Sequence, residues 1–160
     1  MDQIVKPWLD LWDYLDGNFW RVCQWAETQL TPDEVAWQPI PDVASVGWNL
    51  QHHGEMLDYY LARIFLYQPP LRPELPTMIA GSRDHGRWRD VTSIAEYHRR
   101  IRPAYRTFLT TLTAADMERE LERQGRRSIA WGWAIGHIAE HESYHLGKCT
   151  LLRSMLMARR

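Results

Sequence analysis

Three histidines recur at four-residue intervals near the end of the chain: His137, His141 and His145. In a helix, side chains four residues apart lie one above another on the same face, with Cβ atoms about 5–6 Å apart. This face also carries apolar residues, so the ring nitrogens would need partners where water is scarce. A shared metal ion would supply those partners, and the spacing therefore predicts a metal site on this helix.

Only two of these histidines can share an ion, because His137 and His145 are two turns apart. The pair is either His137 with His141 or His141 with His145, and a third ligand must come from another helix. His52 and His53 both lie in an earlier helical segment. Neighbouring side chains point about 100° apart, so at most one of them faces the ion. Periodicity alone leaves both choices open.

Four segments with apolar residues at steps of three and four are expected to form the helices that position these histidines. They span residues 5–25, 45–67, 93–112 and 128–157. Ser45 should cap the second helix, and Ser93, with Glu96 three residues later, should open the third with a capping box. Residues 113–127 could hold a short helix of their own.

A proline-rich segment, residues 68–91, separates the second and third helices and is much longer than a turn between antiparallel neighbours. The sequence therefore predicts an all-α fold, a four-helix bundle with a long crossover between helices two and three, in a single domain of residues 1–160. The crossover, with His85 and Trp88, is either a lid over the site or a solvated loop.

The net charge of −1 gives no reason to expect nucleic acid or a membrane as a partner. The acidic excess of residues 1–60 and the arginine-rich segment 83–127 are expected to lie on helix faces that meet. Two cysteines, Cys23 and Cys149, are too few for a disulfide framework. No export leader and no long apolar window is visible, so we expect a cytoplasmic protein.

Two stretches of the sequence carry a resemblance to a known family. They are Ser45-Val46-Gly47-Trp48-Asn49-Leu50-Gln51-His52 with Gly54-Glu55, and His137-Ile138-Ala139-Glu140-His141-Glu142-Ser143-Tyr144-His145-Leu146-Gly147-Lys148. Both resemble the DinB-like superfamily of metal-dependent enzymes, also called the YfiT-like group. The resemblance extends over nearly the whole chain, including the helix order and the crossover. It implies a nickel or zinc ion held by His52, His141 and His145, and a homodimer.

The resemblance also implies a small-molecule substrate, such as a low-molecular-weight thiol, because such sites keep positions open for water or substrate. Three neutral ligands leave a divalent ion its full charge, which would activate a thiol or water for transfer or hydrolysis. His137, Trp48 and Tyr59 would then line the pocket or support the ligands. Glu55 could orient a ligand or act as a base, and Lys148 could neutralise an anionic substrate.

Two alternatives compete with this prediction. The segment from His141 to His145 matches the H-E-x-x-H pattern of zinc proteases, in which Glu142 would be the general base. The chain beyond residue 145 holds no further His, Asp or Glu, so the downstream ligand of such proteases is missing. The other alternative is a non-catalytic metal-binding or stress-related bundle; a structural ion would need a fourth protein ligand, and the sequence offers no clear one.

Overall fold

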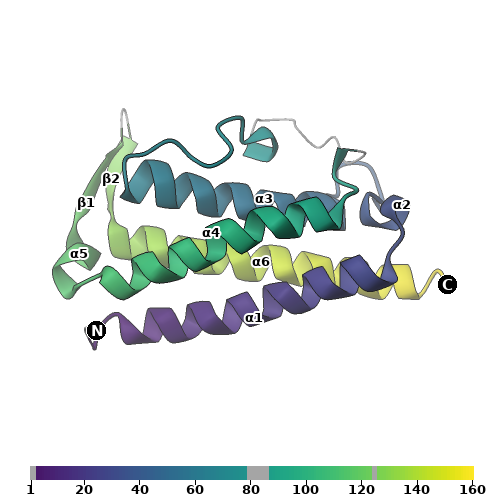
Figure 1. Ribbon diagram of the computed structural model, residues 1–160, viewed down its shortest axis with the longest axis horizontal. Helices are drawn as coiled ribbons and strands as arrows, with labels where there is room; N and C mark the ends of the chain where they lie inside the picture. Colours follow the sequence, from purple (N-terminus) through teal and green to yellow (C-terminus); the bar gives the residue numbers. More distant parts are fainter. Residues whose placement is uncertain (1–2, 79–86, 124–125) are drawn as a thin grey trace.

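Four long helices lie along the longest axis of the protein in the computed structural model, which describes residues 3–78, 87–123 and 126–160 (Figure 1). They are α1 (Lys6–Gln29), α3 (Val46–Asp58), α4 (Val91–Thr111) and α6 (Trp131–Met157). The predicted all-α helical bundle is confirmed. The shorter elements are α2 (Pro32–Val35), the π-helical η1 (Tyr59–Phe65) that continues α3, the 3-10 helix η2 (Pro76–Met78), α5 (Ala114–Glu118), and an antiparallel pair of strands, β1 (Glu120–Arg123) and β2 (Arg126–Ala130).

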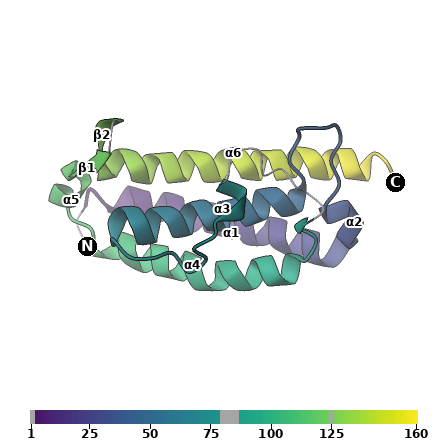
Figure 2. The same cartoon turned by 90° about the horizontal axis from the view of Figure 1, so that it is seen from above.

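The long helices form a four-sided arrangement in which α3 packs against α4 and α6, and α1 packs against the same two helices (Figure 2). In Figure 1, α3 and α4 run in the same direction, opposite to α1 and α6. The chain must therefore return along the bundle between α3 and α4, and this is the long crossover that the sequence predicts. Among the described residues, no helix is long and apolar enough to cross a bilayer.

Two apolar clusters occupy the two halves of the bundle, and a layer of buried polar side chains separates them. One cluster includes the start of α3 and the end of α6, and the other includes η1 and the start of α6. Five of the buried polar residues of α3, α4 and α6 lie between these regions in sequence: His53, Glu55, His98, Glu142 and His145. Arg102 follows Ile101 of the second cluster and joins this layer by donating to Glu142. The buried polar side chains therefore lie near the middle of the bundle, between its two apolar regions.

The crossover is fixed to α3 by a buried carboxylate. Asp58 accepts hydrogen bonds from the backbone amides of Leu71 (2.9 Å) and Arg72 (3.0 Å) and from the Tyr97 hydroxyl (2.7 Å). Farther along, Trp88 is buried, and its carbonyl oxygen lies 1.9 Å from where a Cβ at position 47 would be, so only glycine fits there. Trp88 thus packs in the core; His85, the other residue considered for a lid, lies outside the described residues.

Two predicted helix starts are wrong by two or three residues. Helix α4 begins at Val91 rather than Ser93, because Asp90 is the N-cap and its carboxylate accepts from the Ser93 amide at 3.1 Å. Helix α6 begins at Trp131 rather than residue 128, because residues 126–130 pair with β1. The predicted cap at Ser45 is confirmed, since its hydroxyl accepts from the Trp48 amide.

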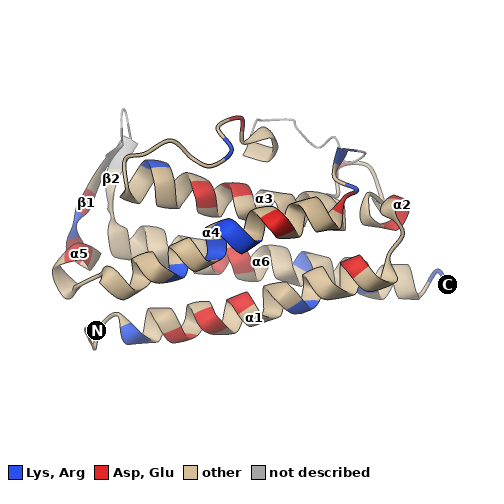
Figure 3. Ribbon diagram, viewed as in Figure 1, with Lys and Arg blue, Asp and Glu red and all other residues tan. Residues whose placement is uncertain are grey.

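Acidic residues of α1 face arginines of α4, as the charge pattern predicts (Figure 3). Arg106 binds Asp13 through two nitrogens, at 2.7 and 2.9 Å, and this pair is about half exposed. One turn earlier, Arg102 donates to Asp16 from a buried position. The same helix contact therefore contains one solvated and one buried arginine.

Candidate metal site

Three histidines from two helices converge beside the polar layer: His52 of α3, and His141 and His145 of α6. One ring nitrogen of each lies within 4.8 Å of the other two. His52 Nε2 and His141 Nε2 are 3.2 Å apart. His52 and His141 are partly exposed and His145 is buried, so the cluster lies where the core meets the surface.

His145 is held in one tautomer by Asn49. The side-chain nitrogen of Asn49 donates to the carbonyl oxygens of Ser45 (2.7 Å) and Ala44 (3.2 Å), which leaves its Oδ1 as an acceptor. His145 Nδ1 lies 2.6 Å from this oxygen and must donate to it. The lone pair of His145 is therefore on Nε2, the atom free to bind a metal.

His52 is held in the same tautomer by Thr77, which lies 25 residues later in η2. The Glu55 carboxylate accepts from the Thr77 amide (2.7 Å), the Thr77 hydroxyl (2.6 Å) and the Gln51 amide group (2.8 Å). Since the hydroxyl gives its hydrogen to Glu55, its oxygen accepts from His52 Nδ1 at 3.0 Å. Glu55 thus orients a candidate ligand through Thr77.

The three candidate ligands are held neutral by their surroundings. Burial is the largest cause in each case and lowers the pKa of His52 to about 4, of His141 to about 3 and of His145 to about 2. The neighbouring histidines add to the effect, because a second positive charge so close would be unfavourable. Neutral imidazoles are the form that binds metal, so no proton need be removed at neutral pH.

The donor set fits a divalent transition metal. Imidazole nitrogens bind zinc at about 2.0–2.1 Å, which places two nitrogens of a tetrahedral site about 3.3 Å apart. The 3.2 Å between His52 Nε2 and His141 Nε2 matches that spacing. Ligand histidines also usually donate their other ring nitrogen to an oxygen acceptor, as His52 and His145 do here.

His53 and Glu142 contact each other in the core and do not belong to the three-histidine cluster. His53 is buried, its Nδ1 lies 3.1 Å from Glu142 Oε2, and Arg102 donates to the other oxygen of Glu142 at 3.0 Å. Burial alone would raise the pKa of Glu142, but Arg102 and then His53 hold it below its usual range. Glu142 is therefore engaged in a buried ion pair and is not available as the base of an H-E-x-x-H protease.

The other predicted site residues lie at different distances from the cluster. Trp48 stacks on His52, with ring centroids 4.5 Å apart. His137 stacks on Trp133 and contacts Glu140, and it is not among the converging histidines. The Tyr59 ring packs edge-on against Tyr60, with ring centroids 5.7 Å apart.

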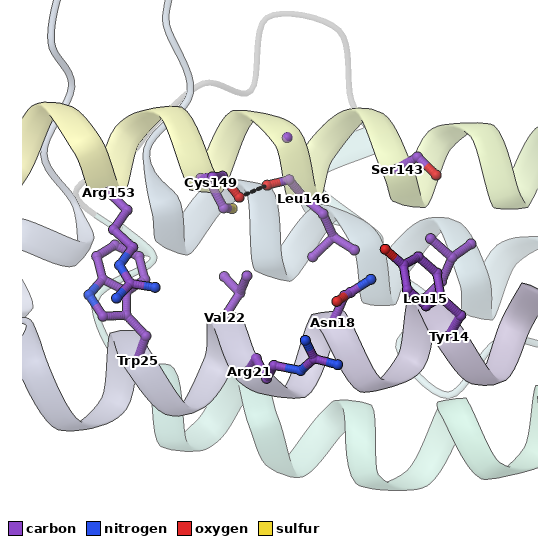
Figure 4. A pocket seen from close by; sticks show the side chains of 12 residues that line it. Tyr14, Leu15, Asn18, Arg21, Val22, Trp25, Ser143, Leu146, Cys149 and Arg153 are labelled. Atoms are coloured by element: carbon purple, nitrogen blue, oxygen red, sulfur yellow. Dashed lines mark hydrogen bonds between the residues drawn. The ribbon is translucent and has the colours of Figure 1, made fainter.

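A cleft of about 560 Å³ opens beside His52 and His145, between residues 39–44 and helix α6. Lys148 lines it and places its ammonium group 4.2 Å from the centre of the Tyr144 ring. A second hollow of about 480 Å³ lies between α1 and α6 and contains none of the clustered histidines (Figure 4). Its Ser143 hydroxyl donates to the Ala139 carbonyl, and burial raises the pKa of its Cys149 thiol, so neither is an activated nucleophile.

Comparison with known proteins supports the family inferred from the two sequence stretches. The model of the DinB superfamily matches residues 19–149, which include all three clustered histidines. The chain belongs to the DinB superfamily. A conserved protein from Enterococcus faecalis has the same fold, with a TM-score of 0.79 over 99% of both chains at 13% identity. No functionally curated protein matches the sequence.

Two residues that support the DinB histidines were missed at the sequence level. Asn49 stands one turn before His52 and interrupts an apolar stripe, and a buried polar residue at such a position is a usable signal. Thr77 gave no signal, because only the fold brings the crossover back to α3. The contribution of Glu55 was expected, but it acts through Thr77 rather than directly.

Replacing Thr77 should test this supporting contact. We expect Thr77→Val to lower zinc affinity about 10–100-fold, because His52 loses the acceptor that fixes its tautomer. Thr77→Ser keeps the hydroxyl and should bind zinc as the wild type does. Competition with a chromophoric chelator measures both. Equal affinity for Thr77→Val and wild type would contradict the role of Thr77.

Proposed function

We propose that this protein is a metal-dependent enzyme that acts on a small molecule, with one nickel or zinc ion held by His52, His141 and His145. The observation that carries the proposal is the convergence of three imidazoles, two of which are fixed with Nε2 as the free nitrogen. A structural zinc site is normally closed by four protein ligands. Among the described residues the metal-binding group contains three, which favours an open site.

The bound ion would lower the pKa of a water molecule or thiol that reaches it, so that either becomes a nucleophile at neutral pH. The protein supplies the rest. Asn49 and Thr77 hold the ligand rings, and Trp48 covers one face of His52. Lys148, at the edge of the cleft, is placed to attract an anionic group. We favour transfer from a low-molecular-weight thiol, or hydrolysis, as the reaction type.

Activity can be tested with two model reactions: hydrolysis of p-nitrophenyl acetate, and displacement of chloride from 1-chloro-2,4-dinitrobenzene by the cysteine thiolate, which forms a thioether and releases chloride and the thiol proton. We expect the zinc- or nickel-loaded wild type to accelerate at least one of them. His141→Ala should show no acceleration, and chelation should remove the activity reversibly. Acceleration that survives in His141→Ala would place the chemistry elsewhere. A metal-loaded protein inactive in both reactions would count against the enzyme proposal and favour a binding protein.

A further inference from the structure

The cleft beside the histidines has one charged end and one apolar end. Its lining along α6 follows the order His145, Lys148, Leu151, Leu152 and Met155. A helix rises about 1.5 Å per residue, so Met155 lies about 10 Å beyond Lys148 along the helix axis. The histidines and the ammonium group are therefore at one end, and the apolar side chains extend away from them.

The apolar end is open to solvent. Ile40, Leu151 and Met155 line the cleft and are 61%, 62% and 38% exposed. Single exposed apolar residues are common, but these three surround one hollow of about 560 Å³, a volume typical of small-molecule sites. Such a hollow with an apolar wall and few polar groups is suited to a ligand with a substantial hydrocarbon part.

The charged end of the cleft determines which polar group of the ligand can bind there. Lys148 is the one cationic side chain among the described residues that line the cleft, and it stands three residues after the candidate ligand His145. The acidic lining residue, Asp42, belongs to the loop that forms the opposite wall. A carboxylate placed between Lys148 and the metal site would be attracted by both positive groups.

From this arrangement we propose that the cleft binds an amphipathic carboxylate, with its acid group at Lys148 and the histidine cluster and its hydrocarbon tail against Leu151, Leu152 and Met155. The assignment of the reacting end rests on the proposed function. The assignment of the tail site rests on the shape and lining of the cleft alone. The ligand is thus defined by a single negative charge and a tail of medium length.

Binding of butanoate, hexanoate and octanoate measured by calorimetry tests the tail site. Each buried methylene contributes about 0.8 kcal/mol, or about fourfold in affinity. We expect affinity to rise about fifteenfold for each pair of methylenes, and octylamine to bind at least about tenfold more weakly than octanoate. Equal binding of the three acids would overturn the tail site, and equal binding of octylamine and octanoate would overturn the acid site.

Three exposed or half-buried positions on α6 supply the variants. Leu151→Gln should flatten the chain-length series, and Lys148→Gln should remove the preference for octanoate over octylamine. Met157→Gln changes an exposed residue of the same helix that does not line the cleft, and should match the wild type. If Leu151→Gln instead converts a dimer to a monomer and leaves octanoate binding unchanged, the apolar end of the cleft is an interface between two copies and the proposal is wrong.

The metal content of the same samples separates the two proposals. A protein that takes up no metal but shows the chain-length series contradicts the proposed function and supports the tail site. A protein that binds one ion but shows no such series supports the metal site and overturns the ligand assignment.

Discussion

Wild-type protein is expected to bind about one nickel or zinc ion per chain, and His141→Ala to bind none after desalting. Loss of a contact that supports a ligand lowers metal affinity about 10–100-fold. Removal of the ligand itself should lower metal affinity by more than that. His141 Nε2 lies 3.2 Å from His52 Nε2, so its loss removes one of the two nitrogens of this pair. Inductively coupled plasma mass spectrometry of protein equilibrated with each metal gives the stoichiometry.

His137→Ala is the matched control for this experiment. His137 lies one turn before His141 on the same helix, with ring centres 6.1 Å apart, but its Nδ1 contacts Glu140 and its nitrogens are not among the converging ligand atoms. It should bind metal as the wild type does. His53→Ala is a poorer control, because it also disturbs the buried contact with Glu142. A wild type that takes up no added metal, or equal loss in His137→Ala and His141→Ala, would refute the site.

Metal binding should also raise stability in a concentration-dependent way. An ion that binds only the folded chain adds about 2.7 kcal/mol to the free energy of unfolding when its free concentration is 100 times the dissociation constant. Urea titrations with and without zinc should therefore differ for wild type and His137→Ala, and coincide for His141→Ala. This readout needs no substrate, so it remains informative whatever the reaction is.

The bundle could be predicted from sequence because each long helix has its own apolar stripe and stop signals. Prolines and polar residues separated the helices, and Ser45 marked the start of α3 correctly. The β1–β2 hairpin was missed because its strands are four and five residues long, too short to show a clear alternation. Its second strand also occupies residues that extend the pattern of α6 backward, which explains the wrong start.

The candidate site could be predicted in part for similar reasons. The pair on α6 follows from a spacing of four residues within one helix, which the sequence displays directly. The choice of His52 over His53 depended on the resemblance, because the two differ only in the side of α3 they occupy. The tertiary contacts that settle their environments, with Thr77 for His52 and with Glu142 for His53, join residues 25 and 89 positions apart. Local periodicity carries no information about such contacts.

The second large effect is expected at Arg102, which lies in the polar layer between the two apolar clusters. Arg102 is buried and donates to Asp16 and Glu142, and its guanidinium also lies 4.1 Å from the centre of the Phe19 ring. Arg102→Met keeps the apolar length of the side chain but leaves Glu142 buried without its main counter-charge. We expect the free energy of unfolding to fall by about 3–5 kcal/mol.

Arg106→Met is the matched comparison, since Arg106 occupies the next turn of α4 and pairs with α1 in the same way. Its ion pair with Asp13 is about half exposed, and such pairs contribute about 0–1 kcal/mol. Urea unfolding of the two variants should therefore differ by several kcal/mol although the chemical change is identical. Similar losses in both would mean that burial does not determine how much these ion pairs contribute to the free energy of unfolding.

Replacing Glu142 tests whether its carboxylate belongs to a buried ion pair or acts as a catalytic base. In Glu142→Gln the amide still accepts from Arg102 but carries no charge, so stability should fall while metal binding is retained. Combining Arg102→Met with Glu142→Leu removes both charges and should recover much of the loss, because an apolar pair of similar volume often replaces a buried ion pair without penalty. If Glu142→Gln abolished turnover and left stability unchanged, Glu142 would be acting as a base. Its ion pair with Arg102 and its contact with His53 predict the opposite result.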